Sequence, residues 1–178
     1  MSAPPPVSLI RCGPEYAAPI LEILNDVILT STALYDYRAR SPEMMQAWFE
    51  TKRRGGFPVI GAVDSAGTLL GFGSYGTFRA FPAYKYTVEH SVYVRKDRRG
   101  EGLGRRLLEA VIAAARENDY HVLIGVIDSS NAASVKLHRS LGFQLCGTFR
   151  EAGFKFGRWL DVEFHQLILT SPAHPVDG

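Results

Sequence analysis

A glycine-rich turn between a strand pattern and a helix pattern constrains this chain more than any other segment. Apolar and polar side chains alternate over residues 86–94, as they do in a half-buried strand. The turn that follows reads Arg98-Arg-Gly-Glu-Gly-Leu-Gly-Arg105. After it, apolar residues recur at helical spacing as far as Ala115. This order of strand, glycine turn and amphipathic helix predicts a helix start whose backbone a ligand can approach closely.

The start of such a helix suits an anion. Its first backbone N–H groups lack partners within the helix, and the helix dipole adds partial positive charge. Arg99 and Arg105 would add charge at the rim, so the turn predicts a pyrophosphate site. No Gly-Lys-Ser/Thr stands at the helix start, and the glycine spacing differs from the G-x-G-x-x-G of dinucleotide-binding folds. The alternative is a glycine-rich surface turn without a ligand.

A second motif begins at Asn131, after an apolar strand pattern over residues 122–127. It reads Asn131-Ala-Ala-Ser-Val-Lys-Leu-His-Arg-Ser-Leu-Gly-Phe143. Together with the Arg-x-x-Gly-x-Gly pattern of residues 99–104, it resembles the acetyl-CoA signatures of the GCN5-related N-acetyltransferase superfamily. The alternative for this segment is a helix that is capped by Asn131 and binds nothing.

The resemblance continues outside these two motifs. Residues 74–81, 87–94 and 155–161 are similar to the phosphinothricin acetyltransferase group of this superfamily. Within that group, the chain resembles the methionine sulfoximine/methionine sulfone N-acetyltransferases most, over about residues 8–170. The resemblance implies an enzyme that transfers acetyl from acetyl-CoA to the α-amino group of methionine sulfoximine, methionine sulfone or phosphinothricin and so detoxifies it. It also implies a homodimer.

The resemblance assigns residues to the acetyl-CoA site as well. The side chain of Asn131 would reach the pantetheine arm, and a backbone N–H of residues 92–94 would meet the oxyanion. The implied acetyl-CoA contacts are Val92, Tyr93, Val94, Arg99, Gly100, Glu101, Gly102, Leu103, Gly104, Arg105, Asn131 and Ser134.

Acetyl transfer requires a base that takes a proton from the amine and donors that stabilise an oxyanion. Glu89 is a candidate base, because a charged side chain in mid-strand is otherwise difficult to place; the alternative is an ion pair on the sheet face. His138 is the second candidate, because imidazole can act as an acid or a base near neutral pH. Many superfamily members carry a tyrosine at its position, and the alternative is a histidine on the helix surface. We predict that both residues are catalytic.

An amino-acid substrate also needs a cation for its carboxylate, and Arg79 at the end of a predicted strand can supply one. Tyr35 lies in a loop between two predicted helices, and this loop would cover the substrate. Strand alternation places His90 on the face opposite Glu89, which argues against a direct role for its ring. The alternatives are a solvated arginine and aromatic rings packed in the core. The predicted substrate-binding residues are Tyr35, Arg79, Ala80, Phe81, Glu89, His90 and Ser91.

The order of the patterns predicts the fold. The predicted helices cover about residues 14–30, 42–54, 103–115 and 131–141, and the predicted strands cover 59–63, 69–78, 86–94, 122–127, 143–150 and 159–169. With the resemblance, this order predicts one α/β domain over residues 1–178 with the GCN5-related N-acetyltransferase fold. That fold is a mixed, twisted, mostly antiparallel sheet flanked by helices on both faces. Its core would cover about residues 8–170 between short flexible ends, and strands four and five would separate to admit the pantetheine arm.

Composition restricts the possible partners and locations. The 178 residues are 46% hydrophobic and 21% charged, which is the composition of a globular protein and excludes a disordered or fibrous one. A net charge of +2 does not favour a nucleic-acid partner. No apolar run approaches the roughly 18 residues of a membrane span, and the start of the chain does not resemble a signal peptide. We expect a cytoplasmic protein without a nucleic-acid or membrane partner.

The two cysteines, Cys12 and Cys146, and the five histidines show no metal-ligand spacing, so no metal is expected. We expect Cys146 to be a small buried strand residue. Two other functions stay open. A protein or peptide N-acetyltransferase would need an open groove instead of a closed pocket, and a non-catalytic acetyl-CoA sensor would need neither Glu89 nor His138.

Overall fold

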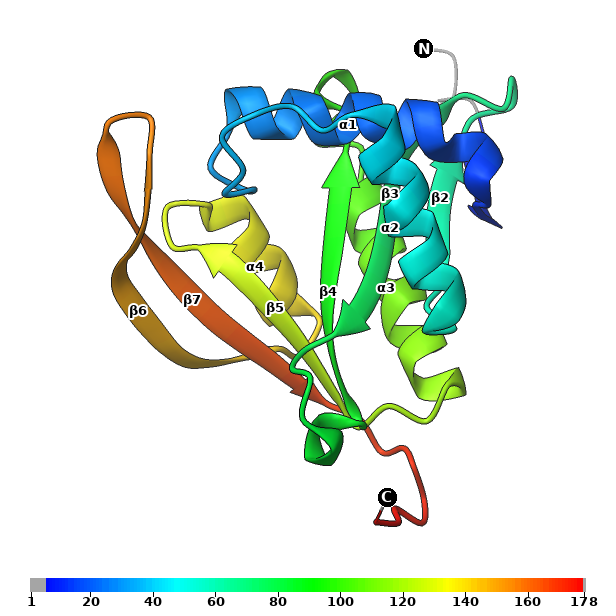
Figure 1. The fold of residues 1–178 in the computed structure, drawn as a ribbon, viewed down its shortest axis with the longest axis vertical. Helices are drawn as coiled ribbons and strands as arrows, with labels where there is room; N and C mark the ends of the chain where they lie inside the picture. The colour runs from blue at the N-terminus through cyan, green and yellow to red at the C-terminus, as the bar shows by residue number, and fades with distance from the viewer. Residues whose placement is uncertain (1–5, 178) are drawn as a thin grey trace.

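The computed structural model describes residues 6–177, which contain seven strands and four α-helices (Figure 1). The strands are β1 (Ser8–Arg11), β2 (Val59–Val63), β3 (Leu69–Thr77), β4 (Thr87–Val94), β5 (Val122–Asp128), β6 (Gln144–Lys155) and β7 (Arg158–Ile168). The helices are α1 (Ala17–Thr30), α2 (Pro42–Arg54), α3 (Leu103–Glu117) and α4 (Ala132–Ser140). The predicted flexible ends include residues 1–5 and 178, which lie outside the described part of the chain.

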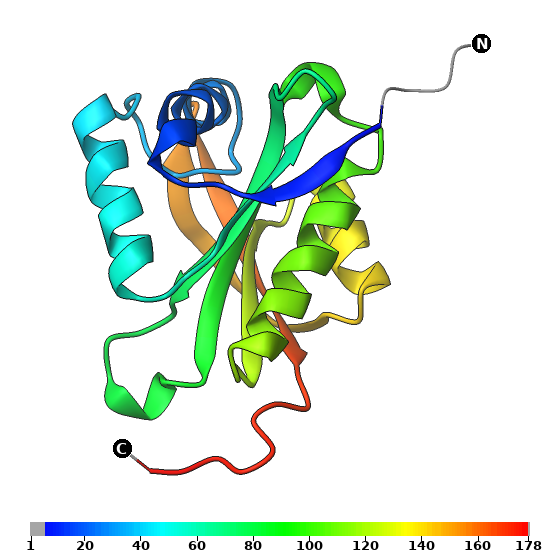
Figure 2. The ribbon, with the colours of Figure 1, turned by 90° about the vertical axis from the view of Figure 1, so that its right-hand side faces the viewer.

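All seven strands form one sheet in the order β1-β2-β3-β4-β5-β7-β6. Neighbouring strands are antiparallel except for β4 and β5, which are parallel. Helices α1 and α2 cover one face of the sheet, and α3 and α4 cover the other (Figure 2). The predicted α/β fold, a mixed and mostly antiparallel sheet with helices on both faces, is confirmed.

The local sequence determines where the helices begin. Pro42 occupies the first position of α2, and the side-chain oxygen of Ser41 accepts a hydrogen bond from the N–H of Met44 at 3.4 Å. At the start of α4, Asn131 Oδ1 accepts one from the N–H of Ser134 at 3.1 Å. Both N-caps agree with the prediction from residue type.

Helix α3 lies close to the sheet because β3 has a glycine where the helix crosses it. A Cβ on Gly73 would lie 2.8 Å from Cγ2 of Val111, which is closer than packed side chains allow. The buried side of α3 includes Leu103, Leu107, Leu108, Val111 and Ile112. This packing fixes the start of α3 relative to the end of β4, and with it the glycine turn that joins them.

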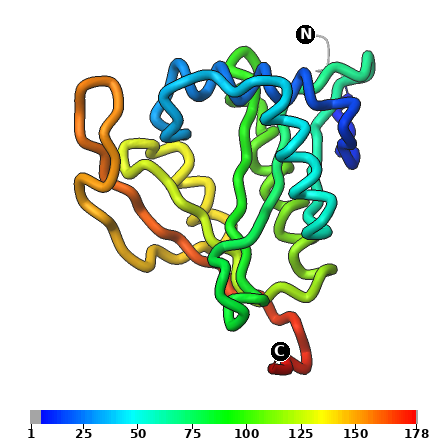
Figure 3. Tube along the Cα trace, in the orientation of Figure 1, coloured from blue at the N-terminus to red at the C-terminus, as the bar shows by residue number. Residues whose placement is uncertain are grey.

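Strands β6 and β7 form a long hairpin that extends away from the rest of the sheet (Figure 3). β6 continues to Lys155, past its predicted end at residue 150, because its later residues still pair with β7 after a shift of register. Strand β1 was not predicted, since four residues are too few to show alternation. Cys146 is exposed, so the expectation that it is buried is wrong; β6 is an edge strand whose side chains are mostly exposed.

The segment after β7 is attached to the sheet. Ser171 Oγ donates a hydrogen bond to the carbonyl of Tyr120 at 2.6 Å. The N–H of Val176 donates to the hydroxyl of Tyr86 at 3.1 Å. These bonds hold the segment beside the start of β4.

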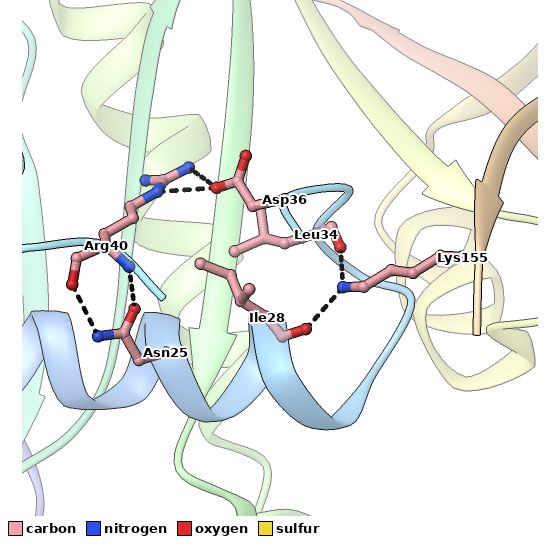
Figure 4. Close-up of polar contacts among 6 residues, drawn as sticks. All are labelled: Asn25, Ile28, Leu34, Asp36, Arg40 and Lys155. Atoms are coloured by element: carbon pink, nitrogen blue, oxygen red, sulfur yellow. Dashed lines mark hydrogen bonds and ion pairs between the residues drawn. The ribbon is translucent and has the colours of Figure 1, made fainter. Parts of the chain in front are cut away.

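A buried lysine joins the β6–β7 hairpin to the α1–α2 loop, residues 31–41 (Figure 4). The ammonium of Lys155 donates hydrogen bonds to the carbonyls of Ile28 (2.7 Å), Ser31 (2.9 Å) and Leu34 (2.6 Å). The first two carbonyls belong to the C-terminal end of α1, where the helix dipole is negative. These three bonds compensate the cost of burying an ammonium whose residue is only 4% exposed.

Further contacts give the α1–α2 loop a defined shape. The N–H of Arg40 donates to Asn25 Oδ1 at 2.8 Å, and Asn25 Nδ2 donates to the carbonyl of Arg40 at 3.1 Å (Figure 4). The guanidinium of Arg40 pairs with Asp36 at 2.8 Å. The hydroxyl of Tyr37 donates to the carbonyl of Phe154 at 2.6 Å. The loop that carries Tyr35 is therefore held against the hairpin.

Replacing the buried lysine tests this attachment. Lys155→Met leaves three buried or half-buried carbonyls without their donor, and we expect it to lower the free energy of unfolding by about 1–3 kcal/mol. Denaturant unfolding followed by circular dichroism measures the change. Lys136→Met on the exposed side of α4 is the matched control, with an expected effect within about 0.5 kcal/mol. Equal stability of the two variants would contradict the role given to Lys155.

Candidate active site

Strands β4 and β5 pair only at their beginnings and then separate. Three residue pairs join them, and the last of these joins Glu89 to Ile124. Beyond this point the two strands diverge towards α1 (Figure 1). The predicted separation of strands four and five is found at this place once the unpredicted β1 is counted as the first strand, and Glu89 lies where the gap begins.

The separation leaves backbone N–H groups of β4 directed into the gap. The N–H of Arg95 donates to the carbonyl of Leu70 at 2.8 Å, on the β3 side. Because hydrogen-bonding directions alternate along a strand, the N–H groups of Val92 and Val94 point to the other side. These two amides are donors without a strand partner on that side, at the place that the resemblance gives to the oxyanion.

The glycine turn presents an open backbone surface. Gly100 and Gly102 have φ angles of 85° and 77°, which other residues rarely adopt. A Cβ on either glycine would meet no described atom within 4 Å other than its chain neighbours. The N–H groups of Leu103, Gly104 and Arg105 make no backbone hydrogen bond within residues 6–177. These residues therefore fit the pyrophosphate of acetyl-CoA.

The charged side chains of the turn are not equally free. Arg105 pairs with Glu109 at 2.9 Å and donates to Ser140 Oγ at 3.1 Å. Glu101 is paired with Arg98 at 2.8 Å. Arg99, in contrast, makes within the described residues only one long hydrogen bond, 3.4 Å to the carbonyl of Val94. Of the predicted contacts, Arg99 is thus the side chain most available to a phosphate.

The predicted base and the predicted cation lie near one another. The Glu89 side chain is half-buried, and no hydrogen bond or ion pair within the described residues holds its carboxylate. Burial raises the pKa of Glu89, and the positive charge of Arg79 partly opposes this shift. Arg79 is exposed, with its guanidinium 4.7 Å from the centre of the Phe78 ring. The alternative of an ion pair on the sheet face is not formed.

The other predicted substrate contacts divide into two groups. Ala80 and Phe81 line, with Arg79, a hollow of about 210 Å³ at the start of β4. Strand alternation puts Ser91 on the same side of β4 as Glu89. Glu89 and Ser91 do not line this hollow, so a substrate site shared by the five residues stays a prediction.

Tyr35 lies apart from this group, at the far end of β5. Burial raises the pKa of Tyr35, and the nearby carboxylates of Asp128 and Asp161 add to the shift. Its ring packs against Gly153 of the hairpin, where a Cβ would collide with it. A contact between Tyr35 and the substrate stays a prediction.

A cluster of buried histidines lies on the opposite side of β4 from Glu89. His90, His138 and His165 are 7%, 5% and 0% exposed, so the alternative of a surface histidine is wrong for His138. Burial lowers the pKa of His138 and lowers that of His90 to about 3. Alternation along β4 predicted the direction of His90. No pattern in the sequence indicated that α4 would bring His138 against it.

Within the described residues, no group of three or more His, Cys, Asp or Glu side chains is arranged to hold a metal ion. Nor does any described helix have the length and the apolar surface needed to cross a membrane.

The separated strands and the glycine turn at a helix start are the site of an acetyltransferase. The chain belongs to the Acetyltransferase (GNAT) family, whose model matches residues 23–143. GNAT acetyltransferases use acetyl-CoA, and membership makes this chain an N-acetyltransferase.

Relatives extend the similarity to nearly the whole chain. The chain is 49% identical over 150 residues to the L-methionine sulfoximine/L-methionine sulfone acetyltransferase of Pseudomonas aeruginosa. This alignment covers 84% of this chain and 87% of that enzyme. The phosphinothricin acetyltransferase of Sinorhizobium meliloti, solved in complex with acetyl-CoA, has a TM-score of 0.91 at 32% identity, covering 95% and 92%. A ribosomal-protein-alanine N-acetyltransferase from Brucella melitensis has a TM-score of 0.89 at 42% identity, covering 91% and 99%. The family and group that the sequence resembles are confirmed.

The electrostatic coupling between Arg79 and Glu89 can be measured directly. Burial raises the pKa of Glu89, and the positive charge of Arg79 opposes that rise. Arg79→Gln removes this charge, so the pKa of Glu89 should rise further above its ordinary value of 4.5. Arg79→Lys keeps the charge and should leave the pKa closer to that of the wild type. NMR titration of 13C-labelled glutamate carboxyls gives both values. A lower or unchanged pKa in Arg79→Gln would show that the two groups are not neighbours.

Proposed function

We propose that this protein transfers the acetyl group of acetyl-CoA to the α-amino group of a small amino acid. The leading substrates are methionine sulfoximine, methionine sulfone and phosphinothricin, which acetylation detoxifies. The carrying observation is that the half-buried carboxylate of Glu89 has no partner among the described residues, while the positive charge of Arg79 acts on its pKa. An α-amino acid carries a carboxylate and an ammonium on one carbon, and this cation and this base are complementary to the two groups. The substrates named for the relatives support the same class.

The acetyl-CoA contacts follow the backbone of the glycine turn. The N–H groups of residues 103–105 hold the pyrophosphate, and Arg99 adds its charge from the rim. Asn131 uses Oδ1 to cap α4, so its Nδ2 is the atom that donates to the pantetheine arm. Acetyl-CoA supplies the thioester whose carbonyl carbon the amine attacks.

Two groups of β4 carry the chemistry. Glu89 takes the proton of the substrate ammonium, and its raised pKa makes the carboxylate a stronger base than an exposed glutamate. The positive charge of Arg79 partly opposes this shift and so favours the ionised carboxylate. The N–H groups of Val92 and Val94 donate to the oxygen that becomes negative when the tetrahedral intermediate forms.

Peptide acetylation is the second candidate, because of the similarity to a ribosomal-protein-alanine N-acetyltransferase. A peptide N-terminus offers an amine but no adjacent carboxylate, so Arg79 would have no partner in such a complex. A non-catalytic acetyl-CoA sensor is disfavoured, because it has no use for a half-buried carboxylate without a partner.

The homodimer and the cytoplasmic location are further parts of this proposal. Large aromatic side chains are exposed on the β6–β7 hairpin, namely Phe149, Phe154, Phe156 and Trp159, and a second copy of the chain would cover them. Two free cysteines and the use of acetyl-CoA support a reducing, cytoplasmic setting.

Glu89→Gln tests the base. We expect kcat at neutral pH to fall by about 10²–10⁴-fold, while the Kd of acetyl-CoA stays within about twofold. In the wild type, kcat/KM should rise with pH through the pKa of Glu89, because only the ionised form accepts a proton. Glu117→Gln, on the exposed end of α3, is the matched control. Turnover by Glu89→Gln at the rate of this control would exclude Glu89 as the base.

A substrate panel tests the class of acceptor. Thiol release from acetyl-CoA is followed with methionine sulfoximine, methionine sulfone, phosphinothricin, the ordinary amino acids, and peptides including one with an N-terminal alanine. We expect saturable turnover with the first three and none with peptides. A kcat/KM that is higher for the alanine peptide than for every free amino acid would favour the second candidate and contradict the first.

A further inference from the structure

His90 and His138 are joined through their ring nitrogens. The two Nε2 atoms are 3.2 Å apart, and the ring planes differ by 19° with centres 5.0 Å apart. The planes are nearly parallel, and the contact between the two nitrogens is a hydrogen bond, in which one imidazole donates and the other accepts. It connects β4 to α4 across the beginning of the gap.

The neighbouring atoms decide which ring donates. His138 Nδ1 lies 2.7 Å from the carbonyl oxygen of Ser134, which can only accept, so the proton of the neutral His138 ring is on Nδ1. His138 Nε2 is then unprotonated and accepts through its lone pair, so the proton between the rings is on His90 Nε2. In the neutral His90 ring, Nδ1 is consequently unprotonated too. That agrees with its burial without a partner among the described residues, since a buried N–H left unbonded would cost more.

The pair lies where β4 and β5 cease to be paired. Glu89 and Ile124 form the last pair of residues, and the next residues along the two strands are His90 and Gly125. A Cβ on Gly125 would lie 3.0 Å from His90 Nε2 and 3.2 Å from His138 Nε2. Glycine at this position leaves the room that the two rings occupy, so the pair fills the beginning of the gap on the side opposite the Glu89 carboxylate.

Burial opposes a positive charge on either ring, and for His138 it outweighs the Ser134 carbonyl, which by itself raises the pKa of that ring. Phe143 presents its ring at about right angles to both, with centres 5.4 Å from His90 and 5.0 Å from His138. From β7, His165 lies 6.3 Å from His138, and the Glu163 carboxylate that accepts its hydrogen bond is 2.7 Å from its Nε2. That carboxylate is therefore already engaged with His165. If His138 Nε2 gained a proton, His90 Nε2 would have to become the acceptor, and the proton of His90 would move to its Nδ1. No acceptor for that Nδ1 is present in the described structure.

We propose that His90 is a positioning residue of the acetyl-transfer site, which donates its Nε2–H to His138 and holds that ring in the Nδ1–H form. Both nitrogens of His138 are then engaged, one with Ser134 and one with His90. His138 thus has neither a free lone pair for the substrate proton nor a free N–H for the leaving thiolate. The inference rests on the proposed function in one respect, because it leaves Glu89 as the group that moves the proton.

NMR of the wild-type protein with 15N-labelled histidine tests the hydrogen-bond arrangement without any substrate. At pH 7 we expect His138 to show a protonated Nδ1 and an unprotonated Nε2, and His90 to show the reverse. Neither ring should gain a proton between pH 7.5 and about 5.5, across the range in which an exposed histidine titrates. A proton on Nε2 of His138, or titration of His138 near pH 6.5, would overturn the proposal. Failure of the substrate panel would leave this result unaffected, so the two proposals can fail separately.

Two substitutions of His90 separate positioning from packing. His90→Gln keeps an N–H donor that can reach His138, whereas His90→Leu fills the space without one. In His90→Leu we expect a titration of His138 that the wild type lacks, because His138 Nε2 loses the N–H donor that engages it. His90→Gln should suppress this titration. Equal behaviour of the two variants would show that His90 only fills space and would overturn the proposal.

Discussion

The early end of the β4–β5 pairing is the constraint on which the site depends. Two parallel strands that share only three residue pairs leave backbone donors of β4 unused beyond Glu89. The same separation gives the Val92 and Val94 amides a common direction and puts Glu89 at the beginning of the gap. At the other end of β4, the close packing of α3 on Gly73 fixes the glycine turn. One departure from regular sheet pairing thus aligns the base, the oxyanion donors and the phosphate site.

Charge is distributed around this gap in a consistent way. Lys155 is buried but fully hydrogen-bonded, and it holds the α1–α2 loop against the hairpin. His90 and His138 behind β4 are buried, which lowers the pKa of both rings, and they contact one another and the Ser134 carbonyl. Arg79 and Glu89 are charged, and neither has a hydrogen-bonded partner in the described chain. A ligand that carries both charges on neighbouring atoms is the natural complement of these two side chains.

Local rules predicted much of this arrangement from the sequence. The N-caps Ser41 and Asn131 depend on neighbours a few residues away, so residue type and spacing identify them. The features that were missed depend on distant segments. The length of β6 depends on its pairing with β7, and the exposure of Cys146 depends on β6 being an edge strand. The contact between His90 and His138 joins residues 48 positions apart, which no periodicity shows.

In the proposed complex, Arg79 binds the carboxylate of an amino-acid substrate whose amine faces Glu89. The most direct test measures kcat/KM for L-methionine sulfone and for its carboxamide, with the wild type and with Arg79→Ala. We predict that the wild type loses about 10–100-fold when the carboxylate becomes a carboxamide, as expected for a charge-assisted contact, and that Arg79→Ala treats the two compounds alike. An equal loss in both proteins would contradict the account, because the carboxylate would then be bound elsewhere.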